Sequence, residues 1–424
     1  MRIGILTYHY VYNEGAIWQA CALCRHLRAS FPGHAFEIID YRHASKHQAI
    51  RSMGCAAALD MRESVLADCL GGPRIESDDT HELFDVIQRQ YDAVIVGSDI
   101  VWQFDRPRSL YARLREALEN EWPLRPSRQS AYACARDIKN WIAHVGRRAT
   151  QPSPRRIPCP NAYWLDPGLP VKRASFAASI GYSDAGRLSA SLRDSMRSHL
   201  AAFDFLSVRD QPTRAFLEAL DPGLGRRAEL TPDPAWLFED PLPEMGGLLR
   251  GAGMEPGRPY AGVLFPARGF YGRHLEHWVF PALRERGFTV VSVIDRNPQA
   301  DIDLAARALT PFEWWSVIRA LDFLFTVRTH PSIAALRYGT PLCNVDITAM
   351  QNRSRHSKSM DMLDTFGLAD VCLFRRETFT RASVVACMGR ALNHEWDWTA
   401  IGRQVARHRA RCREVASLMM AELQ

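Results

Sequence analysis

Short apolar runs alternate with helical periods along the chain, and this rhythm is the feature that most restricts its fold. An apolar run at residues 2–8 is followed by a polar loop, by helical periodicity over 16–29 and by a second apolar run at 36–41. A strand, a helix and a second strand in this order form a βαβ unit with parallel strands. The chain therefore opens as an α/β domain.

The same rhythm returns after an interruption in the middle of the chain. Residues 240–259 are dense in Pro and Gly and show no sustained periodicity, which is typical of a linker. Strands are predicted before it at 91–96, 174–179 and 205–208, and after it at 260–265, 289–294, 323–327 and 342–345. We predict an N-terminal Rossmann-like domain over 1–240, a linker over 241–258, a C-terminal Rossmann-like domain over 259–395 and a C-terminal helix over 396–424.

The charged residues exclude some classes of protein. The chain has 53 basic and 47 acidic side chains, and only four of the basic residues are lysines: Lys46, Lys139, Lys172 and Lys358. The basic residues are scattered without interleaved aromatic residues, so we expect no nucleic-acid binding. The excess of arginine fits an anionic ligand, or a GC-rich genome that favours arginine codons everywhere. Only arginines at particular positions in the fold are therefore evidence of a function.

The cysteines and the N-terminal segment predict the cellular compartment of the protein. Ten cysteines without regular spacing indicate reduced thiols, and the pair Cys21-x-x-Cys24 lies in an apolar helical run, where packing is a better explanation than redox chemistry. The N-terminal apolar run is too short and polar for a signal peptide, and no run approaches the ~18 residues of a membrane span. We therefore expect a cytoplasmic protein that is at most peripheral to a membrane.

Two arginines directly follow predicted strands, where ligands bind in open α/β sheets. Arg209 follows the strand at 205–208, and Arg328 follows the strand at 323–327, with His330 two residues later. A helix that begins at Pro331 would place its N-terminus beside both side chains, a favourable position for an anion.

A purely structural explanation of these residues is equally consistent with their spacing. Arg328 would then pair with an acid such as Asp322 or Asp346, and His330 would only cap the helix. Arg209 would be neutralised by the adjacent Asp210.

An ordered series of short segments resembles the polysaccharide pyruvyl transferase family. Each segment is weak alone, but together they span residues 1 to about 365 in the family's order. The series is the opening Ile-Gly-Ile-Leu-Thr-Tyr, Asn13-x-Gly15-Ala16-x-x-Gln19-Ala20, Ile39-Asp40-Tyr41, Tyr91-Asp92, Val96-Gly97-Ser98-Asp99-x-Val101-Trp102, Ala177-x-Ser179-x-Gly181, Ser207-Val208-Arg209, Asp233-Pro234, Arg328-x-His330 and Tyr338-Gly339-x-Pro341.

The resemblance implies a fold and an activity. The fold is α/β, with two Rossmann-like domains that face a cleft as in GT-B glycosyltransferases, and with the C-terminal helix packed across them. The activity is transfer of a carboxyethylidene (pyruvyl) group from phosphoenolpyruvate onto two hydroxyls of a saccharide or glycoconjugate, with release of phosphate. Family members use two arginines and the Arg-x-His histidine around the donor, which correspond to Arg209, Arg328 and His330. The segments at 110–126 and 151–160 are longer than the common core and leave the acceptor open.

The chemistry of such a transfer agrees with these residue types. Phosphoenolpyruvate carries a carboxylate and a phosphate, so its site needs at least two cationic forks, and no metal or other cofactor is obligatory. Protonation of its methylene carbon needs an acid that titrates near neutrality, which suits His330. Fixed positive charge for the departing phosphate suits the arginines.

Four further residues are weaker candidates. Asp99 and Trp102 follow a predicted strand and could bind the acceptor, although loop capping and core burial explain them as well. Glu14 could be a base or could compensate a helix dipole. Arg268 follows the strand at 260–265 and could reach the phosphate, with a solvated surface position as the alternative.

Two other functions remain open at this stage. A nucleotide-sugar glycosyltransferase would use the same architecture, because a fold does not determine function. A catalytically silent family member would bind a glycan without turnover. The resemblance also allows a lipid-linked acceptor and a homo-oligomer, and the sequence decides neither.

Overall fold

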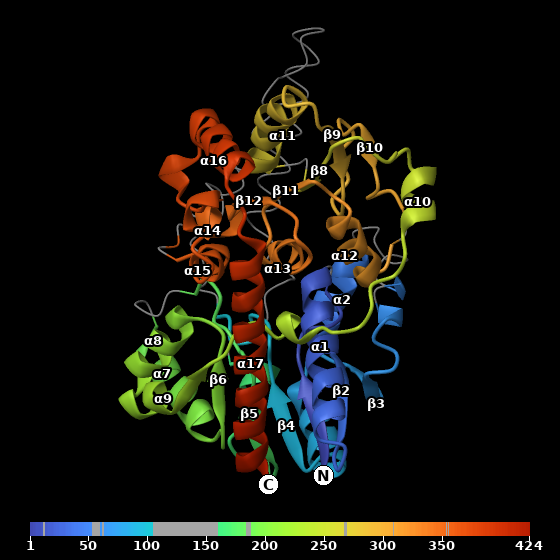
Figure 1. The fold of residues 1–424 in the computed structure, drawn as a ribbon. Coiled ribbons are helices and arrows are strands. Elements are labelled where there is room, and N and C mark those ends of the chain that lie inside the picture. The colour runs from blue at the N-terminus through green and yellow to red at the C-terminus, as the bar shows by residue number, and fades with distance from the viewer. Residues whose placement is uncertain are drawn as a thin grey trace, which may run out of the picture.

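Two parallel sheets, one from each half of the chain, form the frame of the computed structural model (Figure 1). The structure describes residues 1–11, 13–52, 60–61, 63–104, 160–183, 188–266, 269–307, 309–352, 354 and 356–424. The segment 110–126 and residues 151–159 of the Pro-rich stretch, both expected to extend the common core, lie outside the described residues.

The first sheet has the strand order β3-β2-β1-β4-β5, and all its strands are parallel. Its strands are β1 (Arg2–Leu6), β2 (Ala35–Arg42), β3 (Leu70–Glu76), β4 (Ala93–Val96) and β5 (Lys172–Ser175), and the helices between them include α1 (Glu14–Ser30), α2 (Ala44–Ile50) and α4 (Thr80–Gln90). The residues of β4 are all buried, as expected of a strand with helices on both faces. The order reverses between β1 and β4, and open α/β sheets bind ligands at such a switch point.

A two-stranded extension continues the first sheet. β6 (Leu206–Val208) pairs with β7 (Ala228–Leu230), and single bridges link the region of β5 to that of β6. The surrounding helices are η2 (Ala162–Trp164), α7 (Ala190–Ala201), α8 (Gln211–Leu220), α9 (Pro222–Arg227) and η4 (Pro234–Leu237). Side-chain caps fix where they begin: Asp210 accepts the Thr213 amide at the start of α8.

The second sheet repeats this topology. Its order is β10-β9-β8-β11-β12-β13, so that the first strand again lies between the second and the fourth. The strands are β8 (Tyr260–Leu264), β9 (Thr289–Ser292), β10 (Ile302–Asp303), β11 (Phe323–Thr326), β12 (Leu342–Val345) and β13 (Cys372–Leu373). The helices are α10 (Gly246–Gly251), α11 (Gly269–Arg284), α12 (Pro311–Arg319), α13 (Thr329–Tyr338), α14 (Ile347–Asn352), α15 (Lys358–Asp364) and α16 (Arg381–Asn393), with short η5 (Ala369–Val371) and η6 (Arg376–Thr378).

The last helix, α17 (Trp398–Leu423), joins the two halves. It contacts β5 in the first half, α13 in the second and η4 between them, and Figure 1 shows it running down beside both sheets. Its buried residues lie on one side of the helix, which explains its amphipathic pattern. No helix in the described part of the chain is long and apolar enough to cross a membrane.

Helix α1 of the first half also packs against α12 of the second. The indole N–H of Trp18 donates to the Pro311 carbonyl at 2.9 Å, and its ring centroid lies 4.1 Å from that of Trp315. Cys21 and Cys24 are buried in α1, in agreement with a packing role. The α/β class with two Rossmann-like domains, predicted from the sequence, is confirmed.

Candidate functional site

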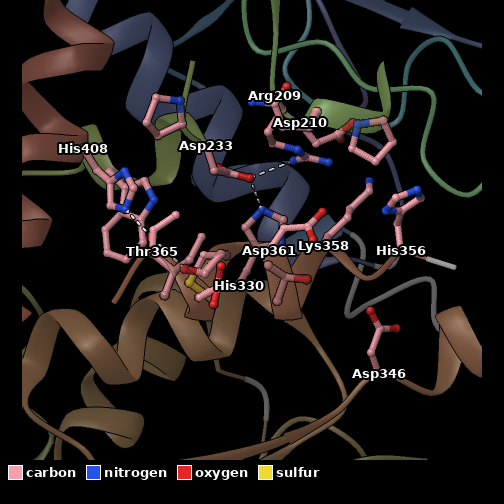
Figure 2. Close-up of a pocket in the computed structure, with 18 of the residues that line it drawn as sticks. Arg209, Asp210, Asp233, His330, Asp346, His356, Lys358, Asp361, Thr365 and His408 are labelled. Atoms are coloured by element: carbon pink, nitrogen blue, oxygen red, sulfur yellow. Dashed lines mark hydrogen bonds and ion pairs between the residues drawn. The ribbon is translucent and has the colours of Figure 1, made fainter. Parts of the chain in front are cut away.

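A cavity of about 1060 Å³ lies between the two halves. It is lined by residues that follow β4, β6 and β7 of the first half and β11 and β12 of the second, together with residues of α15 and α17. The carboxyl ends of both sheets therefore open into one space, the position at which α/β proteins bind ligands. Figure 2 shows the side chains that line it.

Arg209 enters the cavity from the end of β6. Its side chain is largely buried, and its Nη1 donates to Asp233 at 2.7 Å, to Gln19 at 3.2 Å and to the Ser98 carbonyl at 3.2 Å. These hydrogen bonds all leave from one nitrogen, so Nη2 and Nε have no partner within the described residues. Burial disfavours the guanidinium charge, but Asp233, Asp99 and Asp210 together outweigh it and raise the pKa of Arg209.

Asp233 connects Arg209 to His330. Its Oδ1 accepts the Ala235 amide at the start of η4, and its Oδ2 lies 2.7 Å from Arg209 Nη1 and 3.2 Å from His330 Nε2 (Figure 2). The contact to His330 has the distance of an ion pair without the direction of a hydrogen bond. Burial alone would raise the pKa of Asp233, but His330 and Arg209 hold it well below its usual range. Asp233 is therefore held as an anion between Arg209 and His330.

Arginines from two other helices hold the segment that carries Asp233. Arg337 of α13 donates to the carbonyls of Ala235 at 3.1 Å and Trp236 at 3.2 Å. Arg409 of α17 donates to the same Trp236 carbonyl at 3.2 Å. Asp233 is thus positioned by two helices that lie far from it in the C-terminal half of the chain, which a local sequence pattern does not reveal.

His330 lies in the first turn of α13 and packs against Gly15 at the start of α1. A methyl group on Gly15 would lie 1.9 Å from His330 Nδ1, so only glycine allows this approach. Arg328, not His330, occupies the N-cap position, and the structural explanation of His330 as a cap is therefore wrong. The helix begins at Thr329, two residues before the predicted start at Pro331, so that His330 lies within its first turn.

Arg328 is held by two carboxylates. Its Nη1 donates to Glu14 at 2.9 Å, and its Nη2 donates to both oxygens of Asp295 at 2.7 and 2.9 Å. The acids expected from the sequence are otherwise occupied: Asp322 accepts the Tyr260 amide, and Asp346 accepts the hydroxyls of Tyr182 and Ser357. Arg328 lines the cavity, but its guanidinium bridges α1 of the first half to the second half.

The weaker candidates lie in different places. Asp99 lines the cavity, and its Oδ1 accepts the Ile100 amide at 2.7 Å. Glu14 is buried against Arg328 and does not line the cavity, so the structure corrects its assignment as an acceptor base. Trp102 is fully buried and donates its indole N–H to the Tyr163 carbonyl, which corrects its assignment as a sugar platform because no ring face is accessible. Arg268 lies outside the described residues.

Sequence reasoning missed two cavity residues of α15. Lys358 and Asp361 both line the cavity, and both have displaced pKa values. Burial, followed by repulsion from Asp210, raises the pKa of Asp361 to about 6. The rarity of lysine in this chain was the one signal that could have identified Lys358. The described residues contain no group of three or more His, Cys, Asp or Glu side chains suited to a metal ion.

Fold and site together define a two-domain α/β protein of GT-B architecture with an interdomain cavity lined by charged side chains of both signs. A UDP-GlcNAc 2-epimerase from Neisseria meningitidis, bound to UDP-GlcNAc, has a TM-score of 0.52 at 7% identity, with 100% of both chains covered. A UDP-N-acetylglucosamine 2-epimerase from Rickettsia bellii has a TM-score of 0.51 at 9% identity, covering 100% of this chain and 95% of that one. A glycosyltransferase from Rickettsia africae has a TM-score of 0.51 at 10% identity, covering 100% and 98%. At these identities the likeness concerns the fold alone.

The family model of the polysaccharide pyruvyl transferases matches residues 149–347. The chain is similar to that family over the range that contains Arg209, Asp233, Arg328 and His330, and the resemblance found in the sequence is thereby confirmed. No curated protein matches the chain in sequence.

Proposed function

We propose that the protein transfers a pyruvyl group from phosphoenolpyruvate to two hydroxyls of a saccharide or glycoconjugate, forming a ketal and releasing phosphate. The observation that carries this proposal is the chain of contacts from Arg209 through Asp233 to His330 in the interdomain cavity, within the range that matches the pyruvyl transferase model. A fixed cation and a histidine that contact the same carboxylate fit a donor that is both anionic and activated by protonation.

Arg209 binds the anionic donor in this proposal. One nitrogen of its guanidinium is held by Asp233, Gln19 and the Ser98 carbonyl, which fixes the plane of the fork. The remaining N–H groups are directed to a ligand and match a carboxylate or phosphate. Because its contacts already order the side chain, little rotamer entropy is lost when the donor binds.

His330 supplies the proton. His330, which contacts Asp233, transfers a proton to the methylene carbon of phosphoenolpyruvate and leaves an oxocarbenium-like carbon. A first acceptor hydroxyl adds there and returns its proton to His330, phosphate then departs with the C–O bonding electrons, and a second hydroxyl closes the ketal as its proton passes to the departing phosphate. Removal of water from the cavity strengthens each of these electrostatic contributions.

Asp99 is the acceptor-side residue that keeps its predicted place. It lines the cavity with one oxygen on the Ile100 amide, which leaves its second oxygen for a sugar hydroxyl. The cavity volume of about 1060 Å³ accommodates a sugar together with the donor, since ligand sites typically measure ~300–1000 Å³. Arg328 has a structural role in this proposal: its ion pairs with Glu14 and Asp295 join the two halves of the chain beside the donor.

The proposal is tested with purified protein, phosphoenolpyruvate and a pool of saccharides and glycolipids. We expect phosphate release that depends on the acceptor pool, and an added pyruvyl group on one acceptor by mass spectrometry. An Arg197→Gln variant, changed at an exposed helix position, serves as the control for surface arginine loss. Binding of phosphoenolpyruvate without phosphate release from any acceptor would favour the silent glycan-binding alternative.

The glycosyltransferase alternative makes the opposite prediction about ligands. A nucleotide sugar would raise the melting temperature of the protein in proportion to its occupancy, while phosphoenolpyruvate would not. We expect stabilisation by phosphoenolpyruvate and by inorganic phosphate at higher concentration, and none by UDP-sugars. The structural likeness to UDP-sugar enzymes does not decide this point, because it shows the fold alone.

A further inference from the structure

The amine of Lys358 faces the cavity and has no hydrogen-bond partner among the described residues. Its Nζ is buried and makes no hydrogen bond among the described residues, although the side chain lines the cavity. Figure 2 shows the side chain directed from α15 toward Arg209 and Asp210. A buried amine without a partner is costly, so its retention needs an explanation.

Charged groups from both halves of the chain surround this amine. Arg209 repels its positive charge, while the carboxylates of Asp210, Asp99 and Asp233 attract it. The ring of Tyr182 has its centroid 5.8 Å from Nζ, and Asp361 lies one turn away on the same helix. His330 and His356 line the same cavity.

Each nearby carboxylate accepts at least one other donor, and none is hydrogen-bonded to the amine. Asp210 accepts the hydroxyls of Ser179 and Thr213, Asp233 pairs with Arg209 and His330, and Asp99 accepts the Ile100 amide. Burial, followed by repulsion from Arg209, therefore lowers the pKa of Lys358 to about 7 from its usual 10.5. Close to neutral pH the amine exists in both protonation states.

We propose that Lys358 is the second cationic contact of the donor site, and that its amine takes up a proton as the anionic donor binds. The inference rests on the proposed function for the identity of the donor, phosphoenolpyruvate. Arg209 and Lys358 together then supply the two cations that a carboxylate and a phosphate require, in place of the Arg209 and Arg328 pair expected from the sequence.

The physical reason is charge compensation in a buried space. An ammonium beside Arg209 has no hydrogen-bonded carboxylate among the described residues, and a bound dianion supplies one. The bound dianion raises the pKa of Lys358, so the complex binds more protons than the free protein at pH values above about 7. Donor binding at about pH 8 therefore consumes close to one proton, and consumption falls toward zero at about pH 6, where the amine is already charged.

Isothermal titration of phosphoenolpyruvate into the protein, in buffers of different ionisation enthalpy, measures this proton uptake. Phosphoenolpyruvate itself is fully ionised at about pH 8, so the uptake reports on the protein. We expect Lys358→Met to weaken donor binding by at least about tenfold and to remove the uptake. Lys358→Arg, which stays charged, should bind donor without consuming a proton.

Two controls separate this effect from misfolding and from other lysines. Lys358→Met replaces an unpaired amine with an apolar side chain of similar length, so we expect its melting temperature to be at least that of the wild type. Lys172→Met removes an exposed amine paired with Asp204 at 3.5 Å and should leave both affinity and uptake unchanged. Uptake that persists in Lys358→Arg would assign the proton to another group, such as His330, and overturn the inference.

The outcomes also distinguish this inference from the proposed function. Phosphoenolpyruvate binding that is unaltered in Lys358→Met would overturn the role of Lys358 and leave the function standing. If inorganic phosphate binds with Lys358-dependent uptake but phosphoenolpyruvate is never turned over, the role of Lys358 holds and the function fails. If neither phosphoenolpyruvate nor inorganic phosphate binds the wild-type protein, the inference is wrong.

Discussion

Arg209 and Arg328 each follow a strand that ends at the cavity, β6 of the two-stranded extension and β11 of the second sheet, yet they are bound in opposite ways. Arg209 donates from one guanidinium nitrogen to Asp233, Gln19 and the Ser98 carbonyl. Its other guanidinium nitrogens have no partner among the described residues. Arg328 gives one nitrogen to Glu14 and the other to both oxygens of Asp295. The first arrangement prepares an arginine for an external anion, and the second satisfies it internally.

The difference shows that position after a strand does not make an arginine a ligand group. The carboxylates that meet it decide its role, and these arrive from distant parts of the chain. Glu14 is 314 positions from Arg328, and Asp233 is 24 from Arg209. The variants below test whether the two sites differ in function as they do in contacts.

The largest loss of activity is expected from substitution of His330, which Asp233 connects to Arg209. His330→Asn should fold normally and bind donor at moderate affinity, but lose on the order of 10²–10⁴ in kcat, because an amide cannot transfer the proton. The rate profile against pH should also lose one ionisation limb. His81→Asn, an exposed change, is the control. A wild-type rate and pH profile in His330→Asn would place the proton donor elsewhere, with Asp99 the next candidate.

Arg209→Lys should have the next largest effect. Lysine keeps the charge but cannot reach Asp233 and the donor at once, so we expect donor affinity to fall by roughly ten- to a hundredfold. Steady-state kinetics should show the loss mainly in kcat/KM for phosphoenolpyruvate. An unchanged donor affinity would remove Arg209 from the donor site and erase the contrast with Arg328.

Much of the fold was predictable because strand and helix periods are local. Predicted strands at 2–8 and 36–41 correspond to β1 and β2, and the predicted helix at 16–29 to α1. β3 was missed because its Leu-Gly-Gly-Pro start has poor strand propensity and partly exposed residues, and it is formed by pairing with β2. The short β7, β10 and β13 likewise depend on tertiary pairing.

The site was predictable only in part, for the same reason. Residues directly after strands were found, since topology brings the carboxyl ends of strands together. The pairing of Arg328 with Glu14 and the burial of Trp102 were not, because both depend on packing between distant segments. Lys358 was missed because burial, not sequence context, makes its amine unusual.

A smaller effect is expected from Gly15→Ala, which tests how His330 is held. The added methyl would meet Nδ1, Cγ and Cε1 of His330 at 1.9, 2.3 and 2.6 Å, so the ring must shift and its contact with Asp233 must change. We expect kcat to fall by about tenfold and stability by ~1–3 kcal/mol, as for other overpacked sites. Gly402→Ala in α17, where no atom lies within 4 Å of the added carbon, is the control and should retain full activity.

The smallest effect on catalysis is expected from the pair Arg328 and Glu14. Arg328→Gln leaves the buried Glu14 carboxylate without this cation, so we expect the free energy of unfolding to fall by ~1–3 kcal/mol. The loss is smaller than for a fully buried pair because Arg328 is partly exposed. Adding Glu14→Gln removes the uncompensated charge and should restore part of that loss, which chemical denaturation of both single variants and the double variant measures as a coupling energy of ~0.5–2 kcal/mol. Donor affinity should change by less than about threefold in all three proteins, because the donor contacts lie at Arg209 and Lys358. If Arg328→Gln instead weakens donor binding as much as Arg209→Lys does, then Arg328 exchanges its carboxylates for the donor on binding, and the two arginines are equivalent after all.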